Sequence, residues 1–293
     1  MIHRYLYVVR ILISRLLQMK ETGNTYQVFV LEIGAYLKSI HMQTSAGLQV
    51  FTRPFPRIKL TPTSTKEIIE IVKSLKSKNS HGYYEIPIKI LKLSLPFIAS
   101  PLIYICNKSL LKGRFSNMAK IFPNNPTMEK RKKKSAISNY RPISLLTSFS
   151  KIFEKIIFNR LHNHINNNNI LAHEQYGFRN NSSMETASYN LINNILEAFK
   201  NKSTVGGIFC DLTKAFDCVN HIILLSRLEF YAITGNAYNL MKSYLNNRYQ
   251  RVLIKNTNSK NYLSEWEKVK SGVPQGSIPG LLLFLLYIND LPG

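Results

Sequence analysis

A short apolar segment that ends in an aspartate, set among longer segments with helical spacing, most strongly limits how this chain can fold. Residues 204–210 read TVGGIFC and predict a buried strand that ends at Asp211. Residues 249–254 and 262–270 alternate around a polar turn and predict a β-hairpin. Most of the remaining patterned sequence has helical spacing, for example 148–165. The pattern therefore predicts an α+β fold in which helices form the majority.

Capping and breaking residues predict where helices of the first half begin and end. Ser64 followed by Glu67 has the spacing of a capping box and predicts a helix start. A second helix is predicted over 86–93, and a separate third helix after it, because prolines interrupt the spacing. Gly113 is expected to stop the third helix. The polar stretch 124–138 predicts an exposed loop.

Three further helices are predicted in the second half of the chain. One follows Asn181 and runs to about Lys200, and another starts near Ala215 and continues past Leu225. The most apolar run, 280–291, is only about a dozen residues long, which suits a buried helix and not a membrane span.

The balance of charges points to a polyanionic partner. The chain has 39 Lys and Arg against 16 Asp and Glu, a net charge of +23. Such a field attracts nucleic acid, although solubility and binding to a membrane surface also use basic surfaces. Residues 1–20 predict an amphipathic helix too interrupted to span a membrane, and no signal-peptide cleavage site follows. We therefore predict an intracellular protein, in the cytoplasm or nucleus, without membrane partner.

Asp211 has the position of a metal ligand. A carboxylate at the end of a buried strand is held rigidly, as polymerases require of the group that binds magnesium and thereby orders a triphosphate. The alternative is that Asp211 or Asp217 caps the N-terminus of a helix, which is the commoner role of such an aspartate.

Three other short segments favour contacts with nucleotide or nucleic acid. Residues 271–277, SGVPQGS, predict a tight turn that holds the amide of Gln275, although an ordinary loop before a core helix would read the same. Arg141 in NYRPIS suits phosphate because its planar fork binds two oxygens, and a lone surface arginine also serves solubility. The run KRKKK at 130–134 fits a nucleic-acid contact, a solvated face or a localisation signal.

Four strings occur in an order that resembles the reverse transcriptases of jockey-like non-LTR retrotransposons. They read SNYRPISLLTSFSKIFEKIIFNRL, HEQYGFRNNSS, GGIFCDLTKAFDCVNH and SGVPQGSIPGLLLFLLYINDLP. The resemblance implies a right-hand polymerase domain of fingers and palm over residues 58–293, with residues 1–57 unassigned. The implied activity is RNA-directed DNA synthesis with Mg²⁺, which uses an RNA template, a DNA primer and deoxynucleoside triphosphates.

The resemblance also implies roles for individual residues. Asp211 would bind the metal and act in catalysis, and Phe216 would block a 2′-hydroxyl and so select deoxynucleotides. The rest of the nucleotide pocket would consist of Arg141, Lys214, Ala215, Gln275 and Gly276. Nucleic acid would be contacted by Lys130, Arg131, Lys132, Lys133, Lys134 and Arg179.

One departure from the family bears on activity. Members carry a F/Y-A-D-D motif beyond the position of 288–292, and these 293 residues do not contain it. We therefore expect a chain truncated before that motif, with an incomplete metal site, an incomplete palm sheet, no thumb, and no activity on its own. The alternative is a catalytically dead remnant that binds RNA or DNA through its basic residues.

Overall fold

The computed structural model describes the chain in stretches that fall into two compact units. The described residues are 28–32, 55–76, 83, 86–128, 135, 139–179, 182–203, 205, 207–211, 214–254 and 261–290. The first unit comprises mainly Met1–Ala46 and Ala172–Ala215, and the second mainly Gly47–Leu171 and Phe216–Leu291. The expected boundary between residues 57 and 58 does not coincide with this division and stays a prediction.

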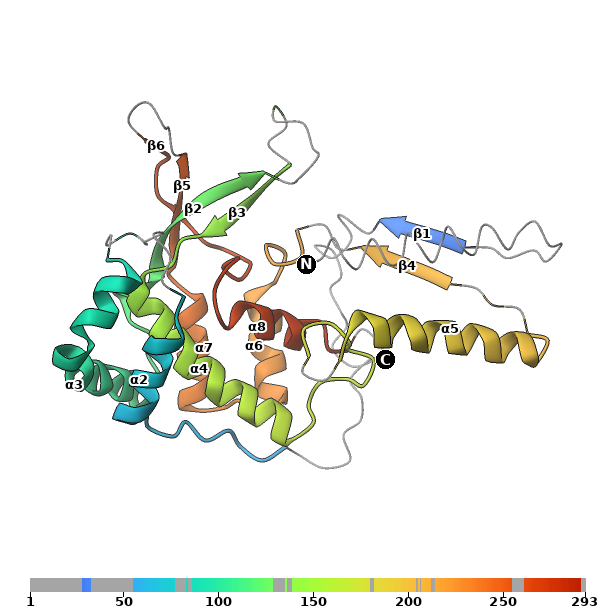
Figure 1. Cartoon of the computed structure of the whole chain (residues 1–293), viewed down its shortest axis with the longest axis horizontal. Helices are drawn as coiled ribbons and strands as arrows, with labels where there is room; N and C mark the ends of the chain where they lie inside the picture. Colours follow the sequence, from blue (N-terminus) through green and yellow to red (C-terminus); the bar gives the residue numbers. More distant parts are fainter. Residues whose placement is uncertain are drawn as a thin grey trace. The chain divides into compact units, whose positions relative to one another are not determined.

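The first unit contains one helix and a pair of strands among its described residues (Figure 1). Helix α5 (Met184–Lys200) is confirmed, and Ser183 caps it by accepting a hydrogen bond from the Thr186 amide at 3.2 Å. Strand β4 (Gly207–Asp211) is also confirmed. Its partner is β1 (Val28–Glu32), in a parallel register that places Glu32 opposite Asp211. The sequence predicted no strand in this part of the chain.

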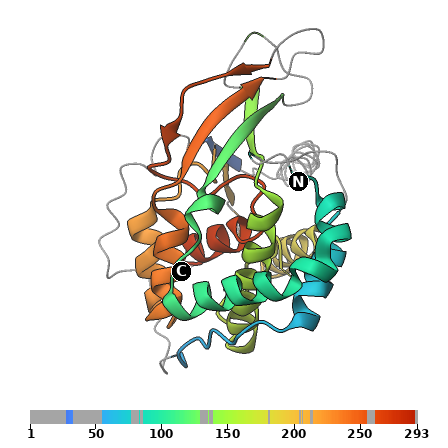
Figure 2. The ribbon, with the colours of Figure 1, turned by 90° about the vertical axis from the view of Figure 1, so that its left-hand side faces the viewer.

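The second unit places helices beneath a mixed sheet (Figures 1 and 2). Its described helices are α2 (Thr65–Ser74), α3 (Ile88–Lys112), α4 (Ser148–Asn167), α6 (His221–Phe230), α7 (Asn236–Leu245) and α8 (Gly280–Tyr287). The sheet consists of β2 (Ile121–Met128), β3 (Tyr140–Ser144), β5 (Tyr249–Ile254), β6 (Tyr262–Leu263) and β7 (Glu267–Lys268). The mixed helix and strand content confirms the α+β class at this coarse level.

Helix α2 begins at the predicted cap, but only half of the predicted capping box forms. Ser64 Oγ accepts a hydrogen bond from the Glu67 amide at 3.2 Å. The Glu67 carboxylate instead binds Arg160 of α4 with both oxygens, at 2.5 Å and 2.7 Å. These hydrogen bonds hold the pKa of the Glu67 carboxyl below its ordinary value.

Helix α3 is a single helix of 25 residues, so the prediction of two separate helices is wrong. Pro96 and Pro101 lie inside it, although an internal proline costs roughly 3 kcal/mol. Leu91 and Leu95 before the prolines and further apolar residues after them are all buried, and this burial favours one continuous helix. The end is as predicted, because Gly113 adopts a left-handed φ of 60°.

Among the described residues, α3 is also the one helix long and apolar enough to cross a membrane. Helices in the cores of soluble proteins are often as long and as apolar, so this single helix is weak evidence for a membrane span. It packs against α2 and α7. The absence of a membrane partner stays a prediction.

The sheet has the order β3-β2-β5-β6, with β7 also paired to β5. The prediction of an exposed loop over 124–138 is wrong for its first residues. Residues 124–128 belong to β2 and pair with β3 in antiparallel register. Strand β2 also pairs with β5 in parallel register. Strand β3 pairs along 124–128, and β5 pairs as far as Asn124, so the strand depends on partners that the side chains of this polar segment alone do not reveal. The hairpin predicted for the later strands is confirmed by the pairing of β5 with β6 and β7.

Local signals also explain the helices of the second half. Helix α6 begins at His221 and not near Ala215, because the Asn220 side chain accepts hydrogen bonds from the amides of Ile222 and Ile223. The sequence analysis missed α7, although its buried positions follow helical spacing. Helix α8 has the predicted position, and all of its leucines except Leu281 are buried, with α6 packed against the helix.

Candidate functional site

The turn that contains Gln275 is anchored to the residues that follow β4. The Val273 amide donates to the Phe216 carbonyl at 2.9 Å, and the Gly272 amide donates to the Val219 carbonyl at 2.8 Å. Gly272 has a φ of 87°, and a Cβ there would lie 2.9 Å from both the Asp217 Cα and the Phe216 carbonyl oxygen. Only glycine allows this approach of two backbones.

The other side of the same turn is anchored to the end of β3. The Ser144 amide donates to the Gln275 carbonyl at 2.8 Å. Gly276 lies beside it with a φ of 106°, where a Cβ would be 3.4 Å from the Ser144 carbonyl oxygen. The structure therefore brings the turn, Phe216 and the end of the NYRPIS segment together within the second unit.

Two side chains of this arrangement have features suited to a ligand. The Oε1 atom of Gln275 is buried and has no hydrogen-bond partner among the described residues. A buried amide oxygen without a partner is costly, and a donor on a ligand would satisfy it. The Phe216 ring is half-buried and packs on Phe284 of α8 with a centroid distance of 5.1 Å. The packing fixes the ring at the edge of the turn.

Glu154 of α4 supports the turn from below, and the sequence analysis missed it. Its Oε2 accepts a hydrogen bond from the Ile278 amide at 3.0 Å. Its Oε1 accepts from Tyr244 Oη and Ser150 Oγ, both at 3.3 Å. The available signal was an acidic residue in the apolar stripe of a helix, since Glu154 is fully buried. Burial raises the pKa of the Glu154 carboxyl above its ordinary value, against the lowering effect of Arg248 and the hydrogen bonds.

Arg248 completes this buried layer beneath the turn. Its guanidinium lies between the rings of Phe122 and Tyr244, 5.0 Å and 4.6 Å from their centroids. It donates to the Tyr244 carbonyl at 3.2 Å, while its Nε and Nη2 atoms have no partner among the described residues. The two cation–π contacts and the electrostatic interaction with the Glu154 carboxyl therefore compensate for burying this charge.

The remaining predicted site residues divide between the two units. Arg141 is half-buried on β3, opposite Thr127. Lys214 is exposed and Ala215 is half-buried, and both belong to the first unit. Arg179, also in the first unit, donates to the Ala172 carbonyl at 3.0 Å. The basic run over 130–134 lies outside the described residues.

Asp211 ends β4, where the sequence placed it, and its side chain lies outside what the structure describes. The register sets Glu32 opposite it, so two residues with carboxyl groups end neighbouring parallel strands. Oxygen donors of this kind fit Mg²⁺. Within the described residues no group of three or more His, Cys, Asp or Glu gathers. The alternative role of an aspartate as a helix N-cap is not supported. Asn220 caps α6, and neither Asp211 nor Asp217 does.

Asp290, which follows α8, is engaged elsewhere. Its carboxylate forms an ion pair with Arg227 of α6, and the carboxylate is 9% exposed. The pair ties the end of α8 to α6.

The order of these motifs matches a known protein family. The family model described as reverse transcriptase (RNA-dependent DNA polymerase) matches residues 130–293, which is more than half of the chain. The chain belongs to the reverse transcriptase family. The match covers β3, α4, β4, the turn with Gln275 and α8, and so includes Ser144, Glu154 and Phe216, which are hydrogen-bonded to the segment that contains the turn.

Transposon proteins of the same family are similar over a longer stretch. The chain is 33% identical over 242 residues to the probable RNA-directed DNA polymerase from transposon BS of Drosophila melanogaster, covering 80% of the chain and 25% of that protein. It is 35% identical over 155 residues to the corresponding protein from transposon X-element, covering 53% of the chain and 16% of that protein. It is 33% identical over 156 residues to the RNA-directed DNA polymerase from mobile element jockey of Drosophila melanogaster, covering 53% of the chain and 16% of that protein. The chain thus spans about a quarter or less of the length of these relatives.

Proposed function

We propose that the chain carries the nucleotide- and template-binding part of an RNA-directed DNA polymerase from a jockey-like non-LTR retrotransposon. One observation carries the proposal. The turn with Gln275 is hydrogen-bonded on one side to Phe216 and on the other to Ser144, so three separate motifs form one surface. On this proposal, β2 and β3 belong to the fingers and β4 belongs to the palm.

The residues around the turn would select and hold a deoxynucleoside triphosphate. The Phe216 ring would occupy the space of a 2′-hydroxyl and so exclude ribonucleotides. The Gln275 Oε1 atom, which lacks a partner among the described residues, would accept a hydrogen bond from the nucleotide or the template base. The Arg141 guanidinium would neutralise the triphosphate, and Lys214, Ala215 and Gly276 are further proposed nucleotide-binding residues.

Asp211 would hold Mg²⁺. When bound, the ion would order the triphosphate and stabilise the charge that develops during nucleotidyl transfer with two metal ions. The task of the chain itself is to present the carboxylate rigidly, and the position of Asp211 at the end of a paired strand supports this.

Basic residues would hold the RNA template and the DNA primer. Lys130, Arg131, Lys132, Lys133, Lys134 and Arg179 are the proposed contacts. The net charge of +23 supports contact with a polyanion. An intracellular location, in the cytoplasm or nucleus, is proposed because three scattered cysteines fit a reducing compartment.

The second candidate function for these 293 residues on their own is nucleic-acid binding without synthesis. The observation that favours it is the lack of a F/Y-A-D-D motif among them. Primer extension on poly-rA with oligo-dT, dTTP and Mg²⁺ separates the two candidates, with Asp211→Ala as the control. Extension that disappears in the control would establish synthesis. A folded protein that binds the hybrid and extends nothing would establish binding alone.

A further inference from the structure

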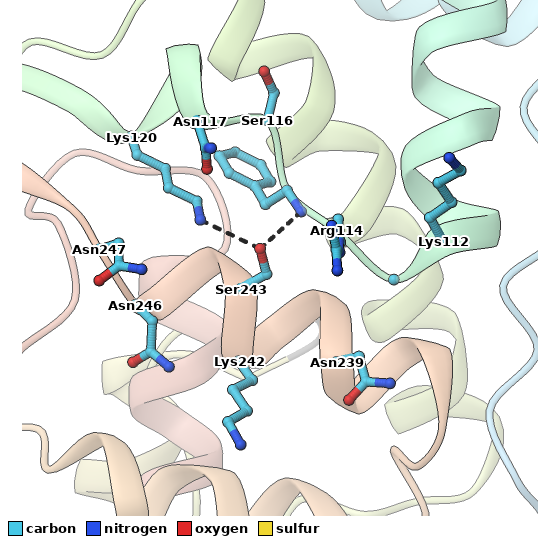
Figure 3. Close-up of a pocket in the computed structure, with 12 residues that line it drawn as sticks. Lys112, Arg114, Ser116, Asn117, Lys120, Asn239, Lys242, Ser243, Asn246 and Asn247 are labelled. Carbon is cyan, nitrogen blue, oxygen red and sulfur yellow. Dashed lines mark hydrogen bonds between the residues drawn. The ribbon is translucent and has the colours of Figure 1, made fainter.

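A basic cavity lies between the end of α3 and α7, away from the turn with Gln275. It has a volume of about 640 Å³, and none of its lining residues belongs to the candidate site described above. Figure 3 shows Ser243 of α7 near its centre, with Lys120 directed at the serine hydroxyl. The same hydroxyl accepts a hydrogen bond from the Phe115 amide. The cavity lies entirely within the second unit.

The charges around the cavity are all of one sign. Among the described residues, Lys112, Arg114, Lys120 and Lys242 line it, and no acidic side chain does. The rest of the polar lining is rich in asparagine amides, which donate hydrogen bonds as readily as they accept them. Four cations with no carboxylate among them create a positive potential, and a concave surface concentrates it.

Lys120 is the least exposed of these cations. The residue is only 5% exposed, and its Nζ atom donates a hydrogen bond to Ser243 Oγ at 3.3 Å. The same Oγ accepts the Phe115 amide at 3.1 Å, and because the hydroxyl carries no charge it does not neutralise the ammonium. Burial lowers the pKa of Lys120, and the nearby charge of Arg248 lowers it further. An anion in the cavity would relieve both effects.

The backbone that forms the cavity wall requires a glycine. Gly113 ends α3 with a φ of 60°, and a Cβ there would lie 2.8 Å from the Asn236 carbonyl oxygen and 3.0 Å from Asn239 Cβ. The connection from α3 therefore closes directly on α7. Lys112 and Arg114, on either side of this glycine, are held at the rim of the cavity by the same turn.

We propose that this cavity binds the phosphodiester backbone of a nucleic-acid strand. Phosphate is the anion that fits several spaced cations and amide donors with no requirement for an apolar contact. The cavity is open, with two of its cations on exposed parts of α3 and α7, so a continuous strand can cross it. The proposal rests on the proposed function only in taking nucleic acid, and not a free polyphosphate, as the source of the phosphate.

The test compares two double variants of the whole chain. Lys112→Gln with Lys242→Gln removes two cations of the cavity, and Lys66→Gln with Lys89→Gln removes two exposed lysines of the same unit that do not line it. Binding of a labelled single-stranded RNA is measured by fluorescence anisotropy over a range of salt concentrations. Each phosphate contact with a single strand contributes roughly 0.7 to the slope of log K against log salt, so the cavity variant should lose about 1.4 of the slope.

The outcomes distinguish the cavity from its alternatives. A loss of slope in the cavity variant, with the control pair unchanged, supports the proposal, and a further loss on Lys120→Gln in a folded protein adds to it. Equal behaviour of the two double variants overturns it. Unchanged RNA binding with weaker binding of pyrophosphate, measured by calorimetry, also overturns it and assigns the cavity to a free polyphosphate. Failure of the chain to bind a nucleotide, with RNA binding intact, contradicts the proposed function and leaves the cavity proposal standing.

Discussion

Single residues in the turn around Gln275 hold three segments of the chain in contact. Gly272 and Gly276 both have positive φ, yet only at Gly272 would a Cβ approach backbone atoms at 2.9 Å. Beneath the turn, the Glu154 carboxylate accepts the Ile278 amide in a fully buried position. A substitution at Gly272 or at Glu154 should therefore lower the stability of the fold, although the turn itself is partly exposed.

The two glycines provide a matched pair of substitutions. Gly272→Ala should lower the free energy of unfolding by on the order of 2 kcal/mol or more, because it adds a backbone clash to the strain of a positive φ. Gly276→Ala carries the strain without the clash and should cost less. Urea unfolding followed by circular dichroism measures both, and equal losses would show that the contact with Phe216 and Asp217 is not tight.

Glu154 should make stability depend on pH. Because its pKa is raised in the folded state, its contribution is fully present below the unfolded carboxyl pKa and is lost as pH rises through the folded value. Glu154→Gln keeps the shape and removes the titration. The stability of the natural chain relative to this variant should therefore be highest in acid, below the ordinary carboxyl pKa, and should decline as pH rises above that value. A difference that stays constant across this range would contradict the assigned burial of the carboxylate.

Among the elements, those with local signals could be predicted from the sequence and those fixed by distant partners could not. Ser64 caps α2, and α8 lies where the apolar run indicated, since a cap and a continuous apolar segment are local features. The joining of α3 across Pro96 and the strand character of 124–128 depend on packing and on partner strands. In the candidate site, the motifs could be recognised in the sequence. The supporting role of Glu154 could not, because its hydrogen-bond partner Ile278 lies 124 residues away.

The ion pair between α2 and α4 supports a prediction at this scale. Arg160→Lys keeps the charge and loses the two-pronged contact with Glu67, so stability near neutral pH should fall by about 1 kcal/mol. The pKa of Glu67 is lowered in the folded state, so the pair stabilises the chain above the unfolded pKa, and the difference from the variant should vanish as pH falls through the folded value. Thermal unfolding at several pH values tests this, with Arg114→Lys as an exposed control. A difference that persists in acid would mean that packing, not charge, is responsible.

For the whole molecule, the excess of basic residues predicts how it meets nucleic acid. A net charge of +23 favours binding through phosphates, which depends steeply on salt and weakly on sequence. Affinities for poly-rA and for a mixed-sequence RNA should therefore be similar and should fall together as salt increases. Anisotropy titrations measure both, and binding that is insensitive to salt would contradict an electrostatic interaction.

The central claim is that the surface formed by Phe216 and the turn with Gln275 selects a deoxynucleotide on an RNA template. The most direct test measures the dissociation constants of dTTP and UTP for the chain bound to poly-rA and oligo-dT with Mg²⁺, before and after Phe216→Ala. The ratio of the two constants cancels general effects of the substitution on folding. If Phe216 selects the sugar, the natural chain should prefer dTTP, and the variant should lose about tenfold of this preference, equivalent to about 1.4 kcal/mol. An unchanged ratio of dTTP to UTP binding would contradict it.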